Sequence, residues 1–177
     1  EEWFKTDNAS IFNGEPNTRA YPIQIAGITT GQGIRDTADM TIKSDIKPWN
    51  DKKIKKYQNF NWFVEIDPKQ AVAIRKQYNW GRAGWESGAI SNDLKTVYFG
   101  NDEAPTAFFK FEAKVANQYQ EGDLFFYKHD HPKKWIKIPY ETDIYLQSVN
   151  DYAVSHGATM FLRNEWVAVD PKTDMVY

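Results

Sequence analysis

The chain has 177 residues, a net charge of −2 and no cysteine. The nearly neutral charge argues against a nucleic-acid partner, and the lack of cysteine excludes disulfides and thiol chemistry in this segment. No apolar run approaches the roughly 18 residues that a membrane span needs. Aromatic residues make up 16% of the sequence, which favours a β-rich fold whose large rings cover pleated faces.

The first third of the chain has weak periodicity and many turn formers. Residues 1–56 are therefore predicted to be an irregular, insertion-like region. Within it, residues 21–28 are a candidate strand and residues 35–43 a candidate short helix. The basic run at residues 52–56 is interpreted as a solvated loop rather than a phosphate-binding patch.

Regular secondary-structure patterns begin at Asn61. A strand is predicted to start at Glu86, and a turn at Glu121-Gly122 is expected to precede the strand over residues 123–128. The other predicted strands cover residues 62–66, 71–76, 96–99, 107–111 and 135–138.

Residues 143–156 are predicted to form a single surface helix, because apolar residues recur there at helical spacing. Thr142 is a suitable N-cap, and Gly157 is a suitable residue for a left-handed C-terminal cap.

Two segments share one layout. Each starts with a glutamate, Glu86 or Glu165, and continues with Ala, an aliphatic residue, a polar turn containing Lys-Thr, and Val-Tyr. A weaker third copy begins at Trp62. Repeated strand–turn–strand units in an all-β chain predict a β-propeller. The two glutamates are 79 residues apart, more than the roughly 40–45 residues of a standard blade, so the blades are elaborated or not adjacent.

The sequence ends in what reads as a strand cut off midway, and we expect the chain to be part of a larger protein. Residues 1–177 are therefore interpreted as one partial propeller domain of the six-bladed type, with its blades in residues 61–177. The rest of the propeller is expected to be missing from this chain.

Glu86 and Glu165 occupy equivalent places at the mouths of innermost strands, which line the channel of a propeller. Carboxylates that meet there are hard oxygen ligands for Ca²⁺. Alternatively, each glutamate accepts backbone hydrogen bonds or pairs with a nearby arginine, Arg82 or Arg163. Asp102 follows a predicted strand and is either a ligand or a turn-capping residue. Arg82 has the planar fork that binds phosphate or carboxylate, with a salt bridge to Glu86 as the competing interpretation.

The same segments resemble the PhoX-type secreted alkaline phosphatases. That family has Gly-Arg-Phe-x-His-Glu where this chain has Gly81-Arg82-Ala83-Gly84-Trp85-Glu86. Its Val-Tyr-x-Gly-Asp-Asp segment resembles Val97-Tyr98-Phe99-Gly100-Asn101-Asp102. The most specific match is to its Arg-Pro-Glu-Trp-Val-Ala-Val-Asp-Pro-Lys-Thr-Gly segment, which is similar to Arg163-Asn164-Glu165-Trp166-Val167-Ala168-Val169-Asp170-Pro171-Lys172-Thr173-Asp174.

The resemblance implies a periplasmic or secreted β-propeller whose channel holds Ca²⁺ and Fe³⁺ and which hydrolyses small-molecule phosphate esters. The family's motif glutamates correspond to Glu86 and Glu165, and its motif arginine corresponds to Arg82. The resemblance implies catalytic roles for Arg82 and Glu86 and metal ligation by Glu86 and Glu165. Asp102 is a further candidate metal ligand because of its place at a strand end. The opening Glu1-Glu2 corresponds to a Cys-Glu-Glu segment of the family and adds two further candidate metal ligands.

The chain also departs from the family pattern. Trp85 replaces the histidine before the first glutamate, Ala83 replaces the phenylalanine after the arginine, and Asn101 and Asn164 replace an aspartate and a proline. Two alternatives therefore stay open beside the phosphatase. One is a non-catalytic propeller that binds a ligand or partner, and the other is a Ca²⁺-dependent lactonase-like hydrolase.

Overall fold

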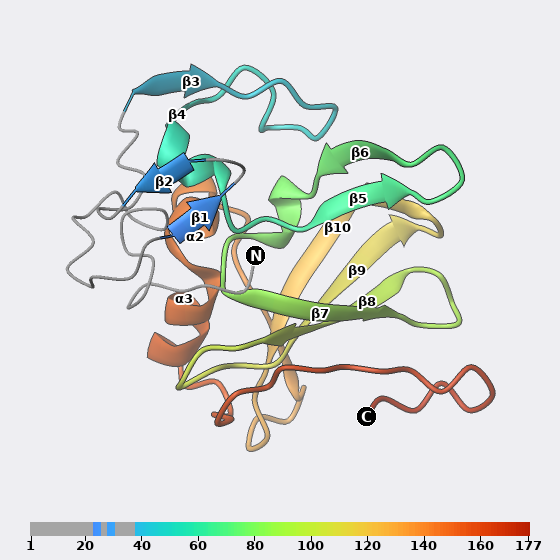
Figure 1. The fold of residues 1–177 in the computed structure, drawn as a ribbon. Helices are drawn as coiled ribbons and strands as arrows, with labels where there is room; N and C mark the ends of the chain where they lie inside the picture. Colours follow the sequence, from blue (N-terminus) through green and yellow to red (C-terminus); the bar gives the residue numbers. More distant parts are fainter. Residues whose placement is uncertain (1–22, 26–27, 31–37) are drawn as a thin grey trace.

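The computed structural model describes residues 23–25, 28–30 and 38–177 (Figure 1). Its largest element is a five-stranded antiparallel sheet with the strand order β11-β10-β9-β8-β7, so consecutive strands are neighbours in a meander. The strands are β7 (Trp85–Ile90), β8 (Thr96–Asn101), β9 (Phe109–Val115), β10 (Gln118–Tyr127) and β11 (Trp135–Lys137).

Three two-stranded antiparallel sheets precede the meander in the chain. They are β1 (Ile23–Ile25) with β2 (Ile28–Thr30), β3 (Asp39–Thr41) with β4 (Lys53–Lys55), and β5 (Val64–Asp67) with β6 (Val72–Lys76). The described helices are η1 (Lys56–Asn59), η2 (Tyr78–Trp80), α2 (Thr142–Gln147) and α3 (Val149–Ser155). The mostly β character predicted from the sequence is confirmed. The described sheets do not close into a ring.

The core forms on one face of the meander. Val97 and Phe99 alternate along β8, and Phe109 and Phe111 alternate along β9, so all four side chains are buried on the same face. Trp80 covers this face, with its ring centroid 4.8 Å from that of Phe99. A second aromatic group joins Trp49, Trp62 and Tyr78, whose ring centroids lie 4.9 to 5.4 Å apart. Ring burial on this scale is a main source of stability for the sheet.

The predicted helix over residues 143–156 is two helices, because another backbone segment interrupts it. In an unbroken helix the Val149 amide would donate to the Tyr145 carbonyl. Here the Val149 amide donates to the Arg82 carbonyl and the Arg82 amide donates to the Tyr145 carbonyl, each at 3.0 Å. Ser148 is extended at the break, and its hydroxyl accepts from the Asp151 amide, which caps α3.

The ends of the predicted helix differ in outcome. Gly157 has a φ of +74°, as predicted for a left-handed C-terminal residue. Thr142 is the first residue of α2 rather than its N-cap, which is Glu141.

Several local predictions in the first half of the chain are wrong. Of the predicted helix 35–43, the described part contains strand β3 instead. The basic run 52–56 contains strand β4, whose Ile54 is buried in the core, so it is not a solvated loop. The candidate strand 21–28 falls partly outside the described residues, and its described part belongs to the hairpin of β1 and β2. These short segments pair with neighbouring strands, and the local residue pattern does not predict that pairing.

The predicted turn at Glu121-Gly122 is also wrong, because it lies inside β10. The pairing of β10 with β9 shifts register between Gln118 and Gly122, so the strand continues through a bulge. Within the described part of the chain, no helix has both the length and the apolar character that a membrane span requires.

Candidate metal centre

Three of the predicted ligands come together in the structure. One carboxylate oxygen from each of Glu86, Asp102 and Glu165 lies within 4.8 Å of the others. Glu86 belongs to β7, Asp102 follows β8 directly, and Glu165 lies in the segment after α3. We refer to these three residues as the carboxylate cluster.

A bulge between β7 and β8 directs the first carboxylate. Trp85 pairs with Asn101 and Ser87 pairs with Gly100, so Glu86 is the extra residue of the bulge. Bulges of this kind redirect a side chain away from the regular alternation of the strand. The Asp102 amide donates to the Gly84 carbonyl at 3.0 Å, which fixes Asp102 beside the bulge.

The segment that carries Glu165 runs alongside β7 and β8 (Figure 1). The Asn101 amide donates to the Asn164 carbonyl at 2.7 Å, and the Ser87 hydroxyl donates to the Glu165 carbonyl at 2.6 Å. Gly100 permits this close approach, since a Cβ atom there would lie 2.3 Å from the Glu165 carbonyl oxygen. The missing side chain of Gly100 therefore helps to bring the third carboxylate to the other two.

Arg163 is the arginine that contacts the cluster. Its Nε and Nη2 donate to the two carboxylate oxygens of Asp102 at 2.5 and 2.8 Å, as a bidentate pair. The same Nε lies 2.9 Å from a carboxylate oxygen of Glu165. The Asp102 side chain is 3% exposed, whereas that of Arg163 is 57% exposed. From the sequence alone, Arg163 is expected only as a possible ion-pair partner of a cluster glutamate.

These contacts shift the pKa values of both partners, so each keeps its charge over a wider pH range. The hydrogen bonds from Arg163 lower the pKa of Asp102 below its usual value. In turn, Asp102 and then Glu165 raise the pKa of the Arg163 guanidinium. Asp102 is therefore ionised throughout the physiological pH range.

Arg82 is held in the interior by carbonyl groups. Its side chain is buried, with Nε donating to the Phe60 carbonyl at 2.9 Å and Nη1 donating to the Leu146 carbonyl at 2.7 Å. Arg82 also makes the backbone hydrogen bonds at the break between α2 and α3. It therefore connects segments that are distant in the sequence. Its predicted catalytic role stays a prediction, and Glu1 and Glu2 lie outside the described residues.

The donor set fits a hard cation. Ca²⁺ takes six to eight oxygen ligands in flexible geometry, and three carboxylates supply up to six oxygens. Carboxylate oxygens are also suitable ligands for Fe³⁺, which is likewise a hard cation, so these three side chains by themselves suit either ion.

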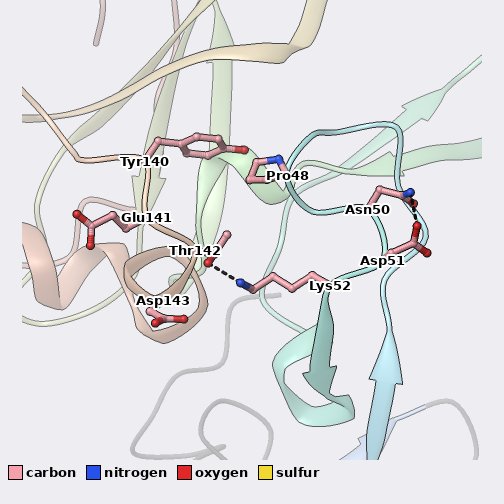
Figure 2. Close-up of a pocket in the computed structure, with 8 residues that line it drawn as sticks. All are labelled: Pro48, Asn50, Asp51, Lys52, Tyr140, Glu141, Thr142 and Asp143. Atoms are coloured by element: carbon pink, nitrogen blue, oxygen red, sulfur yellow. Dashed lines mark hydrogen bonds between the residues drawn. The ribbon is translucent and has the colours of Figure 1, made fainter.

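A separate hollow lies between the loop before β4 and the start of α2 (Figure 2). Its volume is about 520 Å³, and the Lys52 ammonium donates to the Thr142 hydroxyl at 2.5 Å on its wall. The lining is mainly polar or charged and includes no predicted site residue: Pro48, Asn50, Asp51, Lys52, Tyr140, Glu141, Thr142 and Asp143.

Comparisons with known proteins agree with the family suggested by the motifs. A family model described as "Alkaline phosphatase PhoX" matches residues 10–177. A solved structure of Pseudomonas fluorescens PhoX in complex with vanadate, a transition state analogue, has a similar fold, with a TM-score of 0.56 and 23% sequence identity. The match covers 67% of this chain and 27% of that chain, so this chain spans about a quarter of the solved protein.

No curated protein matches the chain at the significance required. The family model nevertheless covers nearly the whole sequence, including all three members of the carboxylate cluster. The chain therefore belongs to the PhoX alkaline phosphatase family.

Proposed function

We propose that the chain is part of a metal-dependent phosphoesterase of the alkaline phosphatase type, which hydrolyses small-molecule phosphate esters. The observation that carries the proposal is the convergence of Glu86, Asp102 and Glu165 in a member of the PhoX family. Three carboxylates from distant parts of a chain gather at one point only at a cost in electrostatic repulsion, which a bound cation offsets.

The cluster would hold the cation, which when bound neutralises charge on the phosphoryl oxygens and activates an oxygen nucleophile. Glu86 would be held over the site by the β7 bulge, and Glu165 by the hydrogen bonds between its segment and Ser87. Asp102 enters as an ionised ligand, since Arg163 lowers its pKa. Rigid strands thus fix two of the ligands, which favours a preorganised site.

Finer features also belong to the proposal. We infer that the site uses Ca²⁺ together with Fe³⁺, that the sheets form part of a propeller, and that the protein works in the periplasm or outside the cell. The family membership and the likeness to the vanadate-bound Pseudomonas fluorescens PhoX support these points.

The test joins metal content to turnover. Protein loaded with Ca²⁺ and iron is assayed by elemental analysis and with p-nitrophenyl phosphate. We expect Glu86→Gln and Glu165→Gln to lose bound metal and hydrolysis together. Glu121→Gln is the matched control, because Glu121 makes an exposed ion pair with Lys114 on the β9–β10 hairpin and is absent from the cluster.

Other outcomes distinguish the alternatives. Unchanged metal content in both cluster variants would refute the assignment of the site. A fully loaded protein that hydrolyses neither p-nitrophenyl phosphate nor its diester would point to a binding propeller. Hydrolysis of lactones in preference to phosphate esters would point to the lactonase-like alternative.

A further inference from the structure

Arg163 makes the contacts that a small cation would make. Its Nε is shared between an oxygen of Asp102 at 2.5 Å and an oxygen of Glu165 at 2.9 Å. Its Nη2 takes the second oxygen of Asp102 at 2.8 Å. One guanidinium therefore bridges two of the three members of the carboxylate cluster.

The charge balance explains why a cationic side chain lies there. Negative charge on carboxylates whose oxygens lie within 4.8 Å of one another is repulsive, and a nearby positive charge lowers that repulsion. The Glu86 carboxylate belongs to the same cluster, so the positive charge of the guanidinium also acts on it. Arg163 thus acts on the whole cluster, although it bonds two of its members.

The carboxylate oxygens of Asp102 cannot bind Arg163 and a cation fully at the same time. Ca²⁺ binds oxygen at about 2.3–2.6 Å and would need lone pairs of Asp102 that now point at the Arg163 fork. Asp102 is buried and tied to Gly84, so it has little freedom to turn toward a second partner. Arg163 is mostly exposed, so its side chain can move into solvent without opening the core.

We propose that Arg163 and the cation compete for Asp102 and Glu165. Arg163 holds the carboxylate cluster together before a cation binds, and it withdraws from Asp102 when the cation enters. Arg163 thereby sets the affinity of the site for its cation, which makes it a positioning residue of the metal centre. This inference rests on the metal site of the proposed function.

The test measures cation affinity rather than activity. Metal-stripped wild type, Arg163→Gln and Arg163→Lys are titrated with Ca²⁺ by calorimetry and with Tb³⁺ by luminescence, for which Trp85 and Trp166 are neighbouring sensitisers in the sequence. We expect Arg163→Gln to bind Ca²⁺ about three- to tenfold more tightly, since a competing charge is gone. Arg163→Lys keeps the charge but loses the fork, so an intermediate affinity is expected.

Lys137→Gln is the matched control, because it removes one positive charge from a separate exposed pair with Asp123. Its affinity should stay within about twofold of wild type. A second measurement uses wild type alone. In ¹⁵N-resolved NMR, the Nε–H signal of Arg163 should shift on Ca²⁺ addition as its bond to Asp102 is lost.

The outcomes separate this inference from the proposed function. Tighter binding by Arg163→Gln, or binding by that variant alone, supports competition. If wild type binds Ca²⁺ and Arg163→Gln binds equally or more weakly, the competition is wrong and the metal site stands. An unshifted Arg163 signal at saturating Ca²⁺ has the same meaning. If neither wild type nor variant binds either cation, the metal site itself fails.

Discussion

The two strongest sequence repeats have the same turn but different surroundings. In the first, Asp93 accepts from the amides of Lys95 and Thr96, and the Thr96 hydroxyl donates to its second oxygen. In the second, Asp170 accepts from the Lys172 amide and from the Thr173 hydroxyl. Aspartate two residues before Lys-Thr therefore builds the same local turn twice.

The weakest repeat follows the same rule. Asp67 accepts from the amides of Lys69 and Gln70 in the turn between β5 and β6. This turn is thus the most transferable feature of all three copies, because it depends only on residues within four positions of each other.

Beyond the turn, the two copies diverge. The first copy forms β7 and β8, with β9 beside β8, and its Val97 is 3% exposed. In the second copy, backbone hydrogen bonds join residues 168–170 to residues 175–177 around an isolated bridge between Val169 and Val176, and Tyr177 is 69% exposed. One sequence pattern therefore forms a core strand in one place and an exposed ribbon in another, depending on the segments that pack against it.

The largest effect is expected from alkaline pH, which should unfold the core that contains the first copy. Burial raises the pKa of Tyr78 to about 12 and also raises the pKa of Tyr145. A folded-state pKa above the unfolded value contributes stability that is complete below about pH 10 and is lost as the pH rises toward 12. We expect cooperative unfolding in that window, with loss of the β7–β8 pairing, followed by circular dichroism and tyrosinate absorbance. Ionisation of every tyrosine near pH 10 in a folded protein would contradict this.

A second test uses a substitution where the two copies are in contact. Gly100→Ala places a Cβ against the Glu165 carbonyl, and we expect a loss of about 3 kcal/mol in the free energy of unfolding together with weaker Ca²⁺ binding. Gly88→Ala is the control, because its Cβ would meet its nearest neighbour at an ordinary 3.5 Å. Urea unfolding and calcium titration measure both effects. Equal stability of the two variants would show that the approach at Gly100 is unimportant.

A third test compares equivalent valines. Val97→Ala leaves a gap in the aromatic core and should lower the free energy of unfolding by about 2 kcal/mol. Val176→Ala, at the matching place in the second copy, should change it by less than about 0.5 kcal/mol. Similar losses in urea unfolding would mean that the second copy is part of the cooperative core.

The smallest effect is expected in the turns. Asp93→Ala removes two backbone bonds in a turn between core strands and should lower the free energy of unfolding by about 1 kcal/mol or less. Asp170→Ala should leave global unfolding unchanged and speed amide exchange only in residues 168–177. Hydrogen exchange by mass spectrometry follows both. A global change from Asp170→Ala would remove the proposed difference between the copies.

Features that depend only on residues close together in the sequence could be predicted from the sequence. The alternation of apolar residues predicted the β-rich fold and strands β5 to β8 within a few residues, because side-chain period and turn chemistry are local. The repeat also placed Glu86 and Glu165 at equivalent positions, and the structure brings both into one cluster with Asp102. From its place at a strand end, Asp102 is either a ligand or a turn-capping residue, and the tertiary structure brings its carboxylate into the cluster.

Tertiary structure alone decided the rest. The break at Ser148 arises from the Arg82 backbone, which lies more than sixty positions away and takes the hydrogen bonds that would continue the helix. Arg163 contacts the carboxylate cluster, whereas Arg82 is buried and donates to a carbonyl group that is distant in the sequence. Charged side chains go to the partners that folding brings near, and spacing along the chain does not contain that information.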